Sequence, residues 1–242
     1  MASGERKMVV VTGARGQIGR VLVDHLSSTY EVCAIDISPP LGLERDWVQE
    51  FSVDITSPLQ VTNFVSGLEK PVWGLINNAG KGVYTDFFDR TAEELESVIS
   101  VNTIGLIYIT RECLKTMLPA GVGRIISVGS IYGQVSSDPR IYGSSGRNNS
   151  EIYSMTKAGV ASFSRYIACN FGGRGITANT ISPGGIFNNQ ADFFVESYVS
   201  KVPTLRMGSP SDLLGAVSLM LSEQSSYING QNLAIDGGLS AW

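Results

Sequence analysis

Tyr153 and Lys157 lie four residues apart in a segment whose pattern predicts a helix. Residues at positions i and i+4 share one helix face, so the Lys157 ammonium is expected near the Tyr153 hydroxyl. A positive charge there favours phenolate over phenol and would lower the phenol pKa from its usual value of about 10. The pair therefore indicates a general acid or base, although the same spacing is also typical of an ordinary solvated helix face.

Two upstream polar residues extend this set. Ser130 follows a segment that predicts a strand, and Asn102 lies within a predicted helix. Taken singly, Ser130 is also compatible with a strand-end cap and Asn102 with a kink in a helix. Together with Tyr153 and Lys157 they form a candidate catalytic set.

The elements that must position these residues alternate along the chain. Helical patterns separate most of the short β-branched runs, and this alternation predicts right-handed βαβ units and a doubly wound parallel sheet with helices on both faces. We expect residues 1–242 to form a single α/β domain. The predicted strands are Met8–Thr12, Val32–Asp36, Phe51–Val53, Val72–Ile76, Arg124–Val128, Thr177–Ile181 and Leu233–Ile235.

A glycine-rich turn follows the first predicted strand and opens a helix near Gln17. Glycines let the backbone approach a pyrophosphate, which a helix N-terminus binds through its free N–H groups. An acidic residue, Asp36, ends the second predicted strand where a ribose diol would lie. This context favours dinucleotide binding over a simple tight turn. The candidate contacts in the turn are Gly13, Arg15, Gly16, Gln17 and Ile18.

The charges around this turn favour NAD over NADP. Asp36 can accept hydrogen bonds from both ribose hydroxyls and would repel a 2′-phosphate, and the next residue, Ile37, offers no compensating charge. Arg15 opposes this preference, because a cation in the glycine turn can hold a 2′-phosphate.

Composition excludes several other classes of function. The formal net charge is −4 and no long run of basic residues is present, so nucleic acid is not an expected partner. No apolar stretch approaches the roughly 20 residues of a membrane span, and no signal peptide is recognisable, so we expect a cytoplasmic protein. One histidine and three scattered cysteines do not predict a metal site, and the cysteines are expected to be buried small hydrophobic residues.

Over nearly its whole length the chain resembles the short-chain dehydrogenase/reductase family, a group of Rossmann-type NAD(P)-dependent oxidoreductases. The resemblance implies that Tyr153 transfers the proton, Ser130 hydrogen-bonds the substrate oxygen, Lys157 holds the nicotinamide ribose, and Asn102 anchors a water molecule of the proton relay. It further implies cofactor contacts from several other segments. These are Asp54 and Ile55 at the adenine, the Asn78, Ala79 and Gly80 segment, and Pro183, Gly184 and Ile186 at the nicotinamide. Asp236-Gly237-Gly238 near the end of the chain also matches the family pattern.

The chain departs from this family pattern at three places. Gln17 replaces a glycine that is usual in compact members, and Asn188 stands where a threonine near the cofactor is usual. The segment between Ser130 and Tyr153 is also longer than usual, which predicts an insert at residues 134–149 on the lip of the active site. The insert and the segment after Pro183 resemble oxidoreductases encoded with bacterial flagellin-modification and surface-glycan genes.

The insert suggests a substrate class. Arg140 and Arg147 could offer forked donors to a phosphate, and Asn148 with nearby serines could bind sugar hydroxyls. We therefore expect a secondary alcohol or ketone on a sugar phosphate or nucleotide sugar, whereas a solvated polar loop is the plainer interpretation of the same residues. The alternatives are a general alcohol or 3-oxoacyl-type reductase, which would need an apolar lip, and a non-catalytic NAD-sensing regulator. A homotetramer or homodimer is expected from the resemblance and from apolar residues on the predicted helices 92–117 and 153–169.

Overall fold

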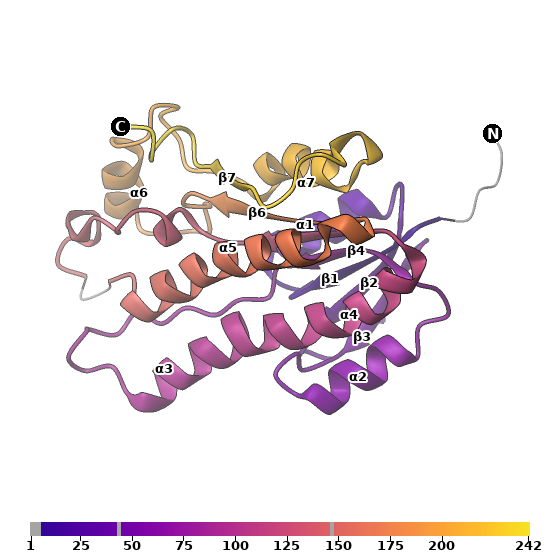
Figure 1. Ribbon diagram of the computed structural model, residues 1–242. Helices are drawn as coiled ribbons and strands as arrows, with labels where there is room; N and C mark the ends of the chain where they lie inside the picture. Colours follow the sequence, from indigo (N-terminus) through magenta and orange to yellow (C-terminus); the bar gives the residue numbers. More distant parts are fainter. Residues whose placement is uncertain (1–5, 43–44, 146–147) are drawn as a thin grey trace.

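A seven-stranded parallel sheet forms the centre of the computed structural model, which describes residues 6–42, 45–145 and 148–242. The strand order is β3-β2-β1-β4-β5-β6-β7, so the chain reverses its direction of winding between β1 and β4 (Figure 1). The strands are β1 (Met8–Thr12), β2 (Glu31–Asp36), β3 (Val48–Ser52), β4 (Val72–Asn77), β5 (Gly123–Val128), β6 (Ile176–Pro183) and β7 (Asn232–Ile235).

Helices cover both faces of the sheet, as Figure 1 shows. One face packs against α2 (Pro58–Ser66), α4 (Leu106–Ala120) and α5 (Glu151–Phe171), and this layer buries Val61, Ile109 and Ile167. The other face packs against α1 (Gln17–Leu26) and α7 (Leu214–Leu221), burying Leu22 and Val217. Strands β1, β4, β5 and β6 are buried over their full length, as expected for a parallel sheet covered on both sides.

The strands predicted from the sequence are confirmed, although the third predicted run, Phe51–Val53, overlaps only the end of β3. Polar side chains cap the starts of two helices. Ser57 accepts a hydrogen bond from the Gln60 N–H at the start of α2, and Thr91 and Glu94 form a reciprocal capping box at the start of α3 (Ala92–Ile99).

The long helix expected over residues 92–117 is interrupted. Residues Ser100–Gly105 form a π-helix between α3 and α4. At Gly105 an added Cβ would lie 2.7 Å from Ile55 Cγ1, so only glycine permits this close approach to the loop after β3. Because π-helical turns widen the backbone and often occur at functional sites, the position of Asn102 inside this turn bears on the site described below.

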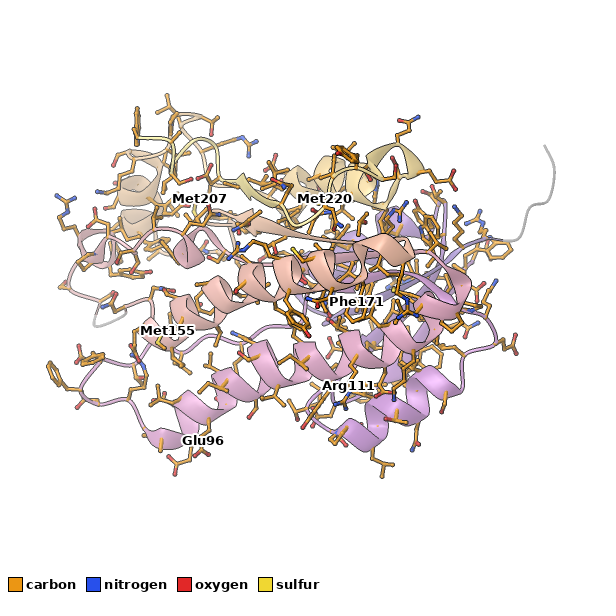
Figure 2. All side chains as sticks on the ribbon, in the orientation of Figure 1. Glu96, Arg111, Met155, Phe171, Met207 and Met220 are labelled. Atoms are coloured by element: carbon orange, nitrogen blue, oxygen red, sulfur yellow. The ribbon has the colours of Figure 1, made fainter. Side chains whose placement is uncertain are left out.

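The predicted insert, residues 134–149, contains a 3₁₀-helix at Pro139–Tyr142 whose Ile141 and Tyr142 are buried. They pack in a small apolar cluster with Tyr198 of α6 (Asp192–Val199), Val202 and Met207. Figure 2 labels Met207 beside α6, at the end of the molecule that also carries the start of α5 near Met155. The insert is therefore attached to α6, and its described residues do not form only a solvated polar loop.

The cysteine prediction is partly wrong. Cys33 and Cys113 are buried, but Cys169 is exposed because it lies on the outer face of α5. Across residues 6–42, 45–145 and 148–242, no group of three or more His, Cys, Asp or Glu side chains is placed to hold a metal ion. Within the same part of the chain, none of the helices has the length and apolarity needed to cross a membrane.

The remaining short elements are 3₁₀-helices. They lie at Ile131–Gly133, Gly172–Arg174, Pro210–Leu213 and Glu223–Ser225.

Candidate active site

A cavity of about 550 Å³ opens at the carboxyl ends of the central strands, where parallel sheets of this type bind ligands. Three of the four candidate catalytic residues, Ser130, Tyr153 and Lys157, line it. The fourth, Asn102, lies behind the wall. Candidate cofactor contacts that also line the cavity are Gln17, Ile18, Asn78, Gly80, Pro183, Gly184 and Ile186.

Tyr153 and Lys157 share a face of α5, as their spacing predicts. Ser150 caps the helix by accepting a hydrogen bond from the Tyr153 N–H at 3.2 Å, which fixes the first turn that carries the phenol. The Lys157 Nζ lies 5.6 Å from the centre of the Tyr153 ring and donates to the Val128 carbonyl oxygen at 2.7 Å. The end of β5 thus holds the ammonium, while a hydrogen bond joins Ser130 to the phenol.

The pKa of the phenol is raised, which differs from the sequence-based expectation. Burial raises the pKa of Tyr153 to about 12, and the hydrogen bond with Ser130 opposes that rise. Burial also lowers the pKa of Lys157 to about 8. The i, i+4 spacing predicted that the two side chains are close, but it did not predict the direction of the Tyr153 pKa shift. Spacing carries no information on how deeply each group is buried. Tyr153 is consequently protonated at neutral pH and suits the role of a proton donor.

The Asn102 side chain is fully engaged in bracing the wall of the cavity. Its Nδ2 donates to the Lys81 carbonyl oxygen at 2.9 Å and to Thr156 Oγ1 at 3.0 Å, and its Oδ1 accepts from the Lys81 N–H at 2.8 Å. Both Nδ2 protons are therefore used within the protein. In this structure Asn102 joins the loop after β4 to α5, and the amide contributes no free donor for the water molecule that the resemblance implies.

The glycine turn has the geometry of a phosphate cradle. Gly13 has φ +61°, and an added Cβ would lie 2.7 Å from Ala79 Cα, so a side chain is excluded there. At Gly19 a Cβ would lie 2.1 Å from the Gly13 carbonyl oxygen. Gly16 precedes α1 without a side-chain cap, so the first N–H groups of the helix are available to an anion. These residues fit the diphosphate of a dinucleotide.

A hydrogen-bond network locks the turn against β4. Thr12 Oγ1 accepts from the N–H groups of Asn78 and Ala79 at 3.0 and 2.9 Å. Asn78 Nδ2 returns two hydrogen bonds to the carbonyl oxygens of Thr12 and Gly13, each 3.0 Å long. Asn78 and Ala79 thus support the cofactor turn from behind, and Asn78 also faces the cavity.

The expected adenosine contacts lie beyond this turn. Asp36 accepts hydrogen bonds from the N–H groups of Arg15 and Ser38, each at 3.0 Å, and lines a small hollow with Arg15. Asp54 holds the N–H and hydroxyl of Thr56 through Oδ1 at 2.9 and 2.7 Å. Ile55 is buried beside Gly105. These carboxylates are held in fixed orientations, as a ribose or adenine contact requires.

The opposite wall of the cavity is a rigid backbone segment after β6. Tyr198 of α6 is buried, and its hydroxyl accepts from the Gly185 N–H at 2.5 Å. A Cβ at Gly185 would lie 2.7 Å from the Tyr198 ring, so the tyrosine requires glycine at this position. Gln17 Nε2 bridges to the Phe187 carbonyl oxygen at 2.5 Å. The departure from glycine at position 17 thus supplies a link between the two walls.

The residues predicted to bind an anionic substrate are not brought together at the cavity. Arg140 is absent from its described lining, its side chain is 82% exposed, and its guanidinium forms a forked pair with Asp138. Asp138 also pairs with Lys201, which ties the insert to the chain just after α6. Asn148 lines a separate open hollow between the insert and the start of α5. Arg147 lies outside the residues that the structure describes.

Sequence reasoning missed the aromatic part of the lining. Tyr142 packs against Phe194 with ring centres 5.5 Å apart, and Phe194 stacks on Tyr198 at 6.0 Å. The i, i+4 spacing of Phe194 and Tyr198 was an available signal of a shared helix face, but nothing local linked it to the insert. The aromatic residues that face the cavity, apart from Tyr153, are Tyr84, Tyr132, Tyr142, Phe193, Phe194 and Tyr198.

Comparison with known protein families agrees with this arrangement. Residues 40–240 match the family model described as enoyl-(acyl carrier protein) reductase. A 3-oxoacyl-(acyl-carrier-protein) reductase of Rickettsia bellii is 30% identical over 240 residues, which cover 95% of this chain and 95% of that protein.

Solved structures show the same fold. A short-chain dehydrogenase of Leptospira borgpetersenii, solved with bound NAD⁺, is 40% identical and superposes with a TM-score of 0.92, covering 98% of this chain and 93% of that chain. A gluconate 5-dehydrogenase of Burkholderia cenocepacia, in complex with NADP and tartrate, is 21% identical with a TM-score of 0.90 over 98% of this chain and 96% of its own. At that identity the second match bears on the fold alone.

Proposed function

The chain belongs to the short-chain dehydrogenase/reductase family, whose oxidoreductases act on CH–OH groups with a nicotinamide cofactor. From this premise we propose that it interconverts a secondary alcohol and a ketone on a sugar-type substrate, with NAD as the preferred cofactor. The observation that carries the proposal is the single cavity that Ser130, Tyr153 and Lys157 share with the wall of Pro183, Gly184 and Ile186.

Bound nicotinamide supplies or accepts the hydride in this chemistry. In the direction of ketone reduction, Tyr153 donates its phenolic proton to the carbonyl oxygen as negative charge develops there. The Ser130 hydroxyl has a single proton, and with substrate bound it turns from the phenol to donate that proton in a hydrogen bond to the same carbonyl oxygen. The Lys157 ammonium stabilises the phenolate left on Tyr153. In alcohol oxidation the same groups act in reverse, with Tyr153 as the base.

The environment of Asp36 supports NAD. Two backbone N–H groups fix the carboxylate at the end of β2, where it can accept from both ribose hydroxyls and repel a 2′-phosphate. Arg15, Arg20 and Arg45 line the same small hollow. Arg45 is paired with Asp24, so Arg15 and Arg20 are the groups that would favour NADP. Steady-state kinetics with NADH and NADPH test the preference, and a higher kcat/KM with NADPH would contradict it.

The lining of the cavity supports a hydroxylated ring as the substrate. Phenol groups at Tyr84 and Tyr142 combine a flat apolar face with a hydrogen-bonding hydroxyl, which suits the CH and OH groups of a sugar. Asn149 and Gln190 add amide groups to the same wall. The resemblance to enzymes of surface-glycan gene clusters points in the same direction.

A 3-oxoacyl or general alcohol substrate is the second candidate. Phe193, Phe194 and Met207 form an apolar stretch of the lining, which is the feature that such a substrate needs. The named relative from Rickettsia bellii is a reductase of this class.

A substrate panel separates the two candidates. The purified protein would be assayed with NAD⁺ or NADH against sugars, sugar phosphates and nucleotide sugars on one side, and against 3-oxoacyl thioesters and simple ketones on the other. We expect the highest kcat/KM within the sugar group, and Tyr153→Phe serves as the control for adventitious turnover. A clear preference for an acyl thioester would favour the second candidate, and NAD binding without turnover of any alcohol or ketone would favour a sensing role.

Assembly into a homodimer or homotetramer is part of the proposal. Apolar side chains remain exposed on α3, on the π-helix that follows it and on α5, namely Ile99, Ile104, Met155 and Tyr166. Contact with a second copy would remove this surface from water. Sedimentation velocity at micromolar concentration would detect the assembly, whereas a 25.9 kDa species would contradict it.

A further inference from the structure

Lys81 is held at the edge of the catalytic set by its neighbours in the chain. On one side is Gly80, where an added Cβ would lie 3.3 Å from Lys157 Nζ. On the other side is Gly82, where a Cβ would lie 3.6 Å from Tyr153 Cδ2. Consecutive Cα atoms are about 3.8 Å apart. The Lys81 backbone therefore lies directly between one residue that is close to Lys157 and another that is close to Tyr153.

The position of Lys81 is fixed by Asn102. The Asn102 side chain accepts from the Lys81 N–H at 2.8 Å and donates to the Lys81 carbonyl oxygen at 2.9 Å. Asn102 also donates to Thr156 of α5, one turn from the reacting pair. The backbone of Lys81 is thus held through both its N–H and its carbonyl oxygen, while Lys81 as a residue is exposed and belongs to the lining of the cavity.

Lys81 is also the cation at the cavity whose charge no ion pair of the described residues neutralises. The described lining includes one other basic residue, Lys157, whose buried ammonium is bound to the Val128 carbonyl oxygen. The same lining includes no Asp or Glu. Arg140, which the sequence suggested for this purpose, lies outside the lining and is paired with Asp138.

We propose that Lys81 binds an anionic group of the substrate, a phosphate or a carboxylate, while Tyr153 acts on the neighbouring CH–OH carbon. The inference rests on the proposed oxidoreductase function and gives its substrate a negative charge. An ammonium on a long flexible stem suits an anion as a point charge with rotatable donors. The aromatic side chains of the same lining suit the uncharged part of the molecule.

The test is a binding experiment, so that it does not depend on knowing the substrate. Inorganic phosphate and, separately, acetate would be titrated into the protein saturated with NADH, by calorimetry at constant ionic strength. Lys81→Met should reduce the affinity for the more tightly bound anion about tenfold, which is equivalent to the loss of one charge-assisted hydrogen bond. Lys81→Arg should restore most of the affinity. Whichever of phosphate and acetate binds more tightly to the parent indicates whether the substrate carries a phosphate or a carboxylate.

Two controls make the outcome specific to this side chain. Arg140→Met removes an exposed charge outside the cavity and should leave anion affinity unchanged. The NADH dissociation constant should be the same in Lys81→Met and the parent, since a rise would mean that Lys81 binds the cofactor and would overturn the proposal. Equal anion affinity in Lys81→Met and the parent, or no anion binding to the parent, would overturn it too.

Failure of this inference is separable from failure of the proposed function. Turnover of an uncharged sugar with no anion effect would refute the role of Lys81 and leave the oxidoreductase proposal intact. Anion binding that depends on Lys81, without turnover of any alcohol, would refute the oxidoreductase proposal and leave Lys81 as an anion-binding residue.

Discussion

The two halves of the cavity are built differently. The cofactor half is made of backbone at the ends of buried strands, with short polar side chains such as Thr12 and Asn78 fastening the glycine turn to β4. The substrate half is made of the insert and α6, which meet through a small aromatic cluster and the Asp138–Lys201 ion pair. The first half depends on the main core, whereas the second depends on a satellite cluster of its own.

This difference separates what is fixed from what can vary. A backbone cradle with positive φ at Gly13 tolerates few substitutions, so the same cofactor can be held by chains of low overall identity. A satellite cluster can be altered without unfolding the sheet, which allows the substrate to change. Tyr153 and Lys157 lie where the two halves meet, and predictions about them have the largest expected effects.

Tyr153→Phe should lose most turnover while binding NADH as well as the parent. The substitution removes the proton donor and keeps the ring, and general acid-base groups typically contribute on the order of 10² to 10⁴ in rate. Single-turnover hydride transfer and NADH fluorescence titration measure the two quantities. A variant that retained more than a tenth of the parental rate, with chemistry rate-limiting, would remove Tyr153 from the mechanism.

Lys157→Met should gain stability at neutral pH while losing activity, because a buried ammonium is costly even with one carbonyl partner. Burial lowers the pKa of Lys157 from 10.5 to about 8 in the folded chain. Below pH 8 the lysine is charged in both folded and unfolded chains, so the burial cost is fully present. Between pH 8 and 10.5 the unfolded chain binds the additional proton, and the parent's free energy of unfolding rises with pH.

The stability difference between Lys157→Met and the parent should therefore be positive at pH 7 and shrink as the pH rises from 8 toward 10.5. Urea unfolding of both proteins at pH 7.0 and 9.5 measures it, and contributions from other titrating groups cancel in the difference. A difference that did not change with pH would show that the folded-state pKa of Lys157 is not lowered.

The contrast between the halves also explains what could be predicted from the sequence. The glycine turn, Asp36 and the Tyr153 pair carry their geometry in local spacing, because each depends on one strand end or one helix face. The contact between Tyr142 and Phe194 joins segments that no local pattern relates. The π-helix around Asn102 was also missed, because the apolar residues of the predicted helix 92–117 do not record an extra residue in one turn.

Arg140 shows a further limit of composition-based reasoning. Its charge and its place in the insert were visible in the sequence, but Asp138, two residues away, was not weighed as its partner. Lys81, which does line the cavity, follows the Asn78-Ala79-Gly80 segment. Only the three-dimensional position of Gly82 against the Tyr153 ring reveals that Lys81 is close to the catalytic residues.

Tyr142→Ala should damage the substrate half alone. Loss of the ring opens the contact with Phe194 and misplaces the substrate, so kcat/KM for the best substrate should fall by at least about tenfold. NADH affinity should stay within about twofold of the parental value. Tyr142→Phe is the matched control, since it keeps the packing and removes only the hydroxyl. An equal loss of NADH affinity in Tyr142→Ala would mean that the two halves are not independent.

Asp36→Ala tests the cofactor half in the same way and should have the smallest effect. The substitution removes an acceptor for the ribose hydroxyls and the repulsion of a 2′-phosphate, and it leaves Arg15 and Arg20 at the hollow. The ratio of kcat/KM for NADH to that for NADPH should fall, by about tenfold if one charge-assisted hydrogen bond is lost. Substrate KM at saturating NADH should hardly change, because Asp36 lies at the end of β2, outside the substrate lining. Asp36→Asn keeps the side-chain size, and its ratio of kcat/KM for NADH to that for NADPH should lie between those of the parent and Asp36→Ala. If the parent already used NADPH better, the arginines would dominate this end of the site and the assignment of NAD would be wrong.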